Sequence, residues 1–158
     1  MAVIGGRNVG TNDLVIMGAG VLMFIDSFLP WYGVDFHGIG GGSVSGWHFF
    51  WNWLSIILVV AIAGATAARV FANRTLPTVA GGAYSWNLIM AALGVLIVVI
   101  LLIRWLTYPS APAHSGIDAG ARIGTYIGLI IAIVQAVFSY LNVVASGERL
   151  PWQQRRTA

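Results

Sequence analysis

Hydrophobic positions fill four long runs of this chain, and almost no charged residue interrupts them. Each run reaches the roughly 20 residues that a helix needs to cross about 30 Å of hydrocarbon. A soluble helix would show a polar face at every turn, whereas residues 54–68 and 88–103 are apolar on all sides. The pattern predicts an all-α protein, a transmembrane four-helix bundle with antiparallel neighbours. The predicted spans cover about 13–32, 47–72, 84–108 and 119–146.

The connections between these spans are short, which predicts a single membrane domain over residues 1–158. We expect outer loops at 33–46 and 109–118 and a cytoplasmic loop at 73–83. The first outer loop holds the glycine run 40–42, and its flanks alternate apolar and polar residues. A short hairpin over the helices and a flexible loop are both compatible with that composition. The prolines of the second loop are typical of an irregular connector.

Composition narrows the class further, because 58% of the residues are hydrophobic and 8% are charged. The net charge of +3 comes from arginine alone, since the chain has no lysine. The arginines flank the predicted spans, where they orient helices, so we expect no binding to nucleic acid. The chain has no cysteine, which excludes disulfides, iron–sulfur clusters and thiolate metal sites.

The distribution of arginine predicts the orientation of the helices. Two arginines, Arg104 and Arg122, fall on one side, and six fall on the side of the termini and the middle loop. Because cytoplasmic loops carry the excess of positive charge, both termini are predicted to be cytoplasmic. We expect a multi-pass protein of the bacterial inner (cytoplasmic) membrane. The six arginines of the cytoplasmic side are Arg7, Arg69, Arg74, Arg149, Arg155 and Arg156.

One carboxylate falls inside a predicted span. Asp26 lies ~7 to 8 Å inside the outer end of the first span, and Arg104 lies ~6 Å before Tyr108 in the third. Because an unpaired charge at that depth is costly, we expect an intramembrane ion pair between Asp26 and Arg104, with Arg122 as a second partner. Two roles remain open for this pair: fixing the register of the helices, or forming a substrate or proton site.

Tryptophans and small residues give the remaining signals within the spans. The tryptophans predict either interfacial anchoring or a platform for a lipid or quinone headgroup. The small residues predict close helix packing, since Gly124 and Gly128 have GxxxG spacing and Gly64 and Ala68 belong to a small face of the second span. The tryptophans of the outer belt are Trp31, Trp47, Trp51, Trp53 and Trp105.

The histidines do not form a recognisable metal motif. His37, His48 and His114 all fall on the outer side near Asp35 and Asp118, but their spacing matches no compact set of ligands. None of them lies within a span, where haem b would need its ligands. The chain also lacks a nucleophile elbow, a phosphate loop and an HExxH motif. We therefore expect no metal, no cofactor and no enzymatic activity.

Three short segments carry a resemblance to a known group of proteins. They are 29–33 (LPWYG), 44–47 (VSGW) and Arg104 shortly before Pro109. With them, the chain resembles a group of small four-span membrane proteins that are common in actinobacteria and largely uncharacterised. The resemblance covers about residues 14–146. It implies the four-span fold and brings no established activity.

Three functional hypotheses follow from these observations. The first is a non-enzymatic accessory or scaffold subunit of a larger respiratory, transport or envelope complex. This hypothesis follows because the chain offers mainly apolar helix surface, which packs against other helices. The second is a small proton-coupled transporter that acts as a dimer, with Asp26 as the coupling residue. The third is a lipid- or quinone-binding protein that uses the outer aromatic belt. The expected partners are membrane lipids and either another protein or a second copy of this chain.

Overall fold

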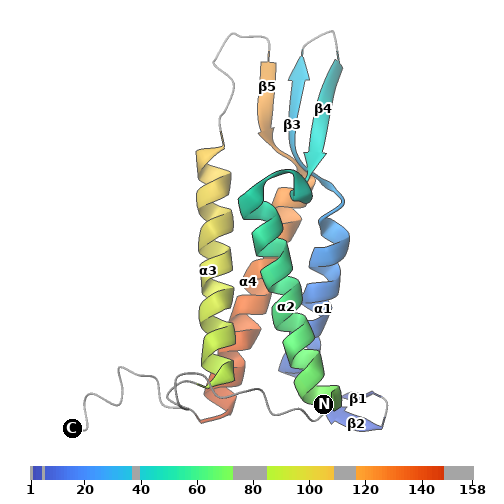
Figure 1. Ribbon diagram of the computed structural model, residues 1–158, viewed down its shortest axis with the longest axis vertical. Helices are drawn as coiled ribbons and strands as arrows, with labels where there is room; N and C mark the ends of the chain where they lie inside the picture. The colour runs from blue at the N-terminus through green and yellow to red at the C-terminus, as the bar shows by residue number, and fades with distance from the viewer. Residues whose placement is uncertain (1, 5, 37–39, 73–84, 109–116, 148–158) are drawn as a thin grey trace, which may run out of the picture.

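The computed structural model describes residues 2–4, 6–36, 40–72, 85–108 and 117–147. In this part of the chain, long helices are combined with short strands (Figure 1). The helices are α1 (Thr11–Asp26), α2 (Phe50–Ala72), α3 (Trp86–Thr107) and α4 (Ile123–Ala145), and a 3-10 turn, η1 (Gly46–His48), precedes α2. The strands are β1 (Ala2–Ile4), β2 (Arg7–Val9), β3 (Pro30–Phe36), β4 (Gly40–Ser45) and β5 (Ile117–Ala121).

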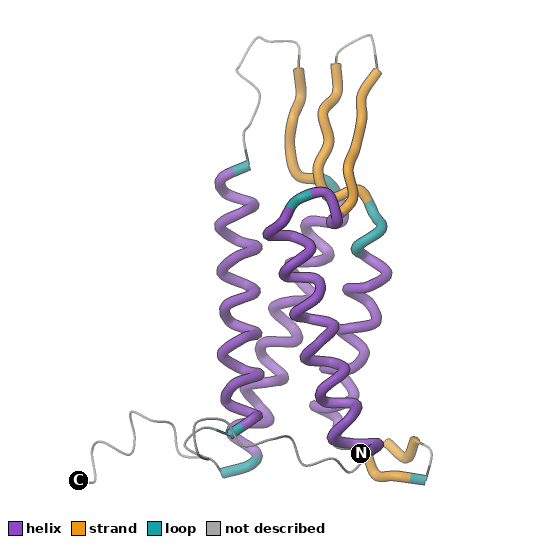
Figure 2. Tube along the Cα trace, viewed as in Figure 1, coloured by secondary structure: helices purple, strands orange, loops and turns teal. Residues whose placement is uncertain are grey.

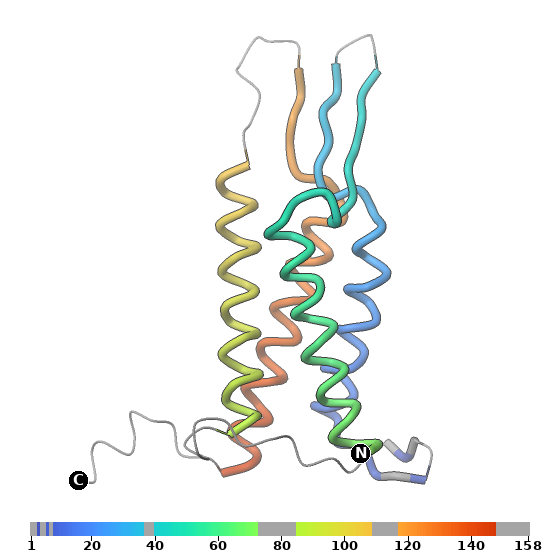
Figure 3. The backbone as a smooth tube through the Cα atoms, viewed as in Figure 1, coloured from blue at the N-terminus to red at the C-terminus, as the bar shows by residue number. Residues whose placement is uncertain are grey.

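The four helices lie side by side and neighbours run in opposite directions (Figures 1 and 3). Helix α1 packs against α2 and α4, and α3 packs against α4 and α2, so that α1 and α3 face each other diagonally. Helices α2, α3 and α4 are each long and apolar enough to cross a membrane. They make this chain a membrane protein by length and composition. They also lie within the predicted ranges 47–72, 84–108 and 119–146.

Helix α1 is shorter than the sequence predicted. It has 16 residues, which correspond to ~24 Å, and it ends at Asp26 where we expected a span to residue 32. The physical reason is that Pro30 begins strand β3, because proline disfavours helical geometry in the residue before it. The Trp31 indole then turns back, and its Nε1 donates a hydrogen bond of 3.0 Å to the backbone carbonyl of Asp26.

A three-stranded antiparallel sheet extends from one end of the helices, which we call the sheet end (Figures 1 and 2). Its order is β4-β3-β5, with Tyr32 opposite Val44 on one side and Ala121 on the other. The first outer loop thus forms the hairpin that its alternation allowed. The described chain is mostly helical, as the sequence predicted, and the sheet is the part that the all-α prediction missed. The irregular connector predicted for the second outer loop was wrong for the described residues 117–118, because β5 pairs with a strand far away in sequence.

The opposite end of the helices carries the first residues of the chain. Strands β1 and β2 form an antiparallel hairpin there around Gly6, whose φ of 77° favours glycine (Figure 1). Val9 at the end of this hairpin is fully buried. The predicted cytoplasmic loop at 73–83 and residues 109–116 of the predicted outer loop lie outside the described residues.

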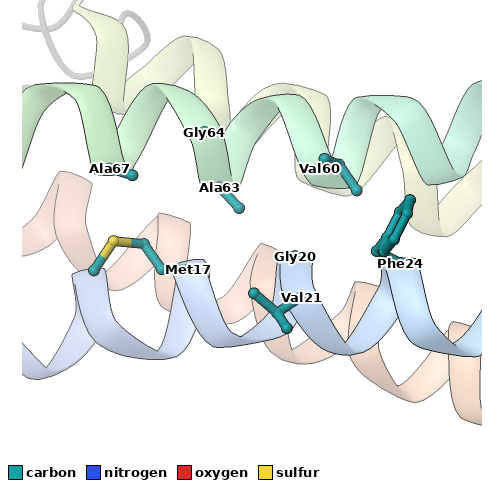
Figure 4. A pocket seen from close by; sticks show the side chains of 8 residues that line it. All are labelled: Met17, Gly20, Val21, Phe24, Val60, Ala63, Gly64 and Ala67. Carbon is teal, nitrogen blue, oxygen red and sulfur yellow. The ribbon is translucent and has the colours of Figure 1, made fainter.

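Small residues allow two close helix contacts, and neither is the contact that the sequence suggested. Gly20 of α1 lies directly against Ala63 of α2, and Gly94 of α3 lies against Ala136 of α4, where an added Cβ would be 3.0 Å from the Ala136 Cα. Gly64, by contrast, is exposed and lines an apolar groove of 340 Å³ between α1 and α2 (Figure 4). The predicted role of Gly64 in tight packing is therefore wrong for this chain alone.

Candidate functional site

The sheet end contains a tryptophan, Trp31, that is completely buried and lies against three glycines. The Trp31 side chain has 0% exposure and lies against Gly46, Gly124 and Gly128. A Cβ at Gly128 would be 2.8 Å from Trp31 Cζ2. The GxxxG pair of α4 therefore accommodates an indole and not the neighbouring helix that we predicted. Trp31 itself belongs to the core and not to the predicted interfacial belt.

Asp26 lies beside this indole at the end of α1. It is 2% exposed, and its Oδ2 would be 2.9 Å from a Cβ at Gly128. Neither of its carboxylate oxygens has a hydrogen-bond partner among the described residues, because the Trp31 Nε1 donates to the Asp26 backbone carbonyl. An isolated ionised carboxylate is very costly in such surroundings, so the position favours a neutral side chain or a bound cation.

The predicted ion pair between Asp26 and Arg104 is not formed. In the described part of the chain, the ion pairs are Arg69–Asp13 and Arg122–Asp35. Equal depth was not sufficient to bring Asp26 and Arg104 together, because α1 and α3 are diagonal neighbours and the chain after Asp26 turns into β3. Arg122, the predicted second partner, contacts Asp35 of β3.

Arg104 lies instead against aromatic rings. Its guanidinium carbon Cζ is 4.5 Å from the ring centre of Phe49, 5.5 Å from that of Tyr108 and 5.6 Å from that of Tyr32. The rings of Tyr32 and Tyr108 stack with their centres 4.2 Å apart. We call Tyr32, Phe49 and Tyr108 the aromatic cage. Its three residues come from separate parts of the chain, so sequence analysis did not predict it.

Further polar groups are buried among the apolar helices. Both amide atoms of Asn52 and the hydroxyl of Ser139 have no hydrogen-bond partner among the described residues. Gln135 donates a hydrogen bond of 2.9 Å from Nε2 to the carbonyl of Val59, while its Oε1 has no partner. Gln135 and Ser139 are four residues apart and share one face of α4 with Gly128, which lies next to Asp26. Unsatisfied polar groups therefore follow the inner face of α4.

The opposite end of the helices is joined by a second polar cluster that includes one side chain from each helix. Asp13 Oδ1 accepts hydrogen bonds from Arg69 at 2.6 Å and from Asn142 at 2.8 Å, and Arg69 also donates to Asn87 Oδ1 at 2.5 Å. Sequence analysis assigned Arg69 only an orienting role and made no connection to Asp13. The available signal was that all four polar residues fall at the same end of apolar helices.

The other aromatic belt residues lie near the sheet end. Trp47, Trp51 and Trp105 are 39%, 53% and 37% exposed, and Trp53 is half-buried. Trp47 donates a hydrogen bond of 2.9 Å from Nε1 to the Ser27 hydroxyl. Such partly exposed indoles at one end of apolar helices have the geometry of interfacial anchors.

The outer histidines and aspartates, for which the sequence predicted no metal site, are only partly described by the structure. His48 is exposed and contacts Phe49 edge to face, with ring centres 5.2 Å apart, whereas His37 and His114 lie outside the described residues. Asp35 and Asp118 are opposite each other in β3 and β5. In the described ranges, no three side chains of the metal-binding types are grouped.

Comparison with known proteins adds no functional information. No family model, curated protein or solved structure matches this chain. Three features of the described residues bear on function. At the sheet end, Asp26 is a buried carboxylate without a hydrogen-bond partner and Arg104 is a cation within an aromatic cage, and along their length the helices expose apolar faces.

Proposed function

We propose that this protein is a non-enzymatic accessory or scaffold subunit of a larger membrane complex. Its helices present apolar surface, and the polar cluster around Asp13 and Arg69 joins the helices to one another at 2.5–2.8 Å. Large apolar side chains are exposed on α1, α2, α3 and α4. This distribution suits a protein whose outer surface binds lipid and other helices.

The observation that carries this proposal is a shallow apolar groove between α3 and α4. It has a volume of 590 Å³ and includes Ala91, Ala92 and Ala136, with Val95 and Tyr140 at its sides. Small side chains allow a partner helix to approach closely, and in a membrane such packing is a main source of helix association. We propose that a transmembrane helix of a partner protein occupies this groove.

We further propose that all four helices cross the bacterial inner membrane, with both termini in the cytoplasm. Helix α1 is ~24 Å long, and the turn from Ser27 to Leu29 carries the chain onward to the sheet end. The excess of arginine at the opposite end supports this orientation. The sheet would then project from the outer surface.

Purification under mild detergent from the native host tests the proposed role. We expect the wild-type protein to copurify with one partner in fixed stoichiometry. Ala92→Trp fills the groove and should release the partner, while Ala61→Trp on the exposed surface of α2 should retain it. Recovery of the wild-type chain only as a monomer or homodimer would contradict the proposal.

The environment of Asp26 favours a second candidate function, a proton-coupled transporter that acts as a dimer. A buried carboxylate without an arginine partner can bind and release a proton or cation, which an ion pair would prevent. Proteoliposomes with an entrapped pH-sensitive dye test this function. A proton flux that Asp26→Asn abolishes and Asp35→Asn preserves would replace the scaffold proposal with this one.

A further inference from the structure

Arg104, at the sheet end of α3, has no anionic partner among the described residues. Two other described arginines, Arg69 and Arg122, each contact an aspartate, but no carboxylate of the described residues lies within 4.0 Å of Arg104. Its Nε is buried and has no hydrogen-bond partner there. The rings of the aromatic cage attract the positive charge but accept no conventional hydrogen bonds from a guanidinium, which has five N–H donors.

The same arginine lines an apolar groove on the outside of the helices. This groove, between α2 and α3, has a volume of 280 Å³. Trp51 and Ile100 form apolar walls, and Ile103 and Thr107 continue the α3 side. The Thr107 hydroxyl donates a hydrogen bond of 2.7 Å to the Ile103 carbonyl, so its proton is already engaged within α3. The groove therefore places the positive charge of Arg104 next to an apolar surface that runs along α3.

We propose that this groove binds an anionic phospholipid of the leaflet at the sheet end. The lipid phosphate accepts hydrogen bonds from the Arg104 guanidinium, whose planar donors match phosphate oxygens in two-point contacts. An acyl chain lies along Ile100 and Ile103, and the exposed indole of Trp51 borders the glycerol region. The rings of the aromatic cage contact the same guanidinium, whose Cζ lies 4.5–5.6 Å from their centres.

A phospholipid explains the two parts of the site better than a free anion. A free phosphate would leave the apolar walls of the groove without a ligand. A phospholipid would cover these walls with its acyl chain and neutralise Arg104 with its phosphate. The groove also opens on the flank of α2 and α3, two helices that are apolar enough to cross a membrane, where lipid is the surrounding solvent.

Native mass spectrometry of delipidated full-length protein tests the proposal with phosphatidylglycerol and phosphatidylcholine of equal chain length. We expect one phosphatidylglycerol to bind at least tenfold more tightly than phosphatidylcholine. Arg104→Gln should remove this preference, and Arg104→Lys should retain part of it because the charge remains without the planar donors. Arg122→Gln is the matched control and should change affinity less than twofold, since Asp35 already contacts Arg122.

A second variant keeps the test independent of the folding of the Arg104 variants. Ile103→Trp leaves the cation in place but obstructs the groove at a side chain that is 55% exposed, so it should weaken the binding of both lipids. Equal binding of phosphatidylglycerol by wild type and Arg104→Gln would overturn the proposal. Displacement of the lipid by equimolar inorganic phosphate would also overturn it, in favour of a free-anion site. Because this groove is distinct from that between α3 and α4, these results leave the partner test unaffected.

Discussion

The Trp31 indole occupies the space that a side chain at position 128 would need, with Trp31 Cζ2 2.8 Å from the Cβ that Gly128 lacks. The indole is therefore held between the end of α1 and the backbone of α4. This relationship also encloses Asp26, whose Oδ2 would be 2.9 Å from the same Cβ. The absence of a side chain at Gly128 thus leaves room beside α4 for both the indole and the Asp26 carboxylate.

Gly128→Ala should destabilise the protein because the added methyl group has no free space. Overpacking of this kind costs about 1–3 kcal/mol of unfolding free energy. Gly64→Ala is the matched control, since a Cβ there meets no atom within 4 Å and alanine favours the helix by up to about 1 kcal/mol. Reversible unfolding in mixed micelles would measure both changes. Equal stability of Gly128→Ala and wild type would show that the indole is not held as described.

Asp13→Asn should destabilise the helices more than Asp35→Asn. Asp13 is 19% exposed in its side chain and accepts hydrogen bonds from Arg69 and Asn142, so its loss should cost about 1–2 kcal/mol. Asp35 is 53% exposed, and pairs of that kind contribute about 0–1 kcal/mol. The same unfolding measurement compares the two variants. A larger loss in Asp35→Asn would place the stabilising contact in the sheet instead of at the opposite end.

Asp26→Asn and Arg104→Gln should have independent effects on stability. Because these residues form no ion pair, their changes should add within about 0.5 kcal/mol in the double variant. Asp26→Asn alone should leave stability unchanged or raise it, since an uncharged amide replaces a buried carboxyl group with no partner. A double-mutant cycle measures the coupling. A coupling energy above about 1 kcal/mol would instead indicate that Asp26 and Arg104 interact, as the sequence predicted.

Single cysteines should report the proposed orientation, because the natural chain contains none. Ser43→Cys in β4 is exposed and should react with an impermeant thiol reagent added to intact cells. Ala72→Cys at the exposed end of α2 should react only after the membrane is opened. Gly41 is a poorer labelling position, since a Cβ there would collide with Asp35. The reverse pattern of labelling would show that the topology is opposite to the one proposed.

The apolar helices were the most predictable part of the fold. Residues 54–68 and 88–103 are apolar on every side, and both stretches fall inside long helices, α2 and α3. Length and uniform hydropathy are local properties, so the sequence alone is sufficient to reveal them. The glycine-rich hairpin of β3 and β4 was one of two alternatives, because alternation indicates a strand only when a partner strand is present.

The candidate site was predictable only as a set of residue types. Asp26 and Arg104 stood out because ionisable groups are rare in such spans, yet depth along two helices says nothing about which helices are neighbours. GxxxG spacing identified Gly124 and Gly128 as a place of close approach without naming Trp31 as the group that approaches. The aromatic cage combines Tyr32, Phe49 and Tyr108, which only the folded chain brings together.

The hydrophobic pattern was enough to show that this is a membrane protein with long apolar helices, because that pattern needs no information beyond neighbouring residues. The folded chain was needed to show which carboxylate pairs with which arginine and that β5 joins β3. Those features depend on contacts between segments far apart in the chain, such as the hydrogen bond of 2.8 Å from the Arg122 amide to the Trp31 carbonyl. Such contacts depend on the packing of all four helices, which no local pattern encodes.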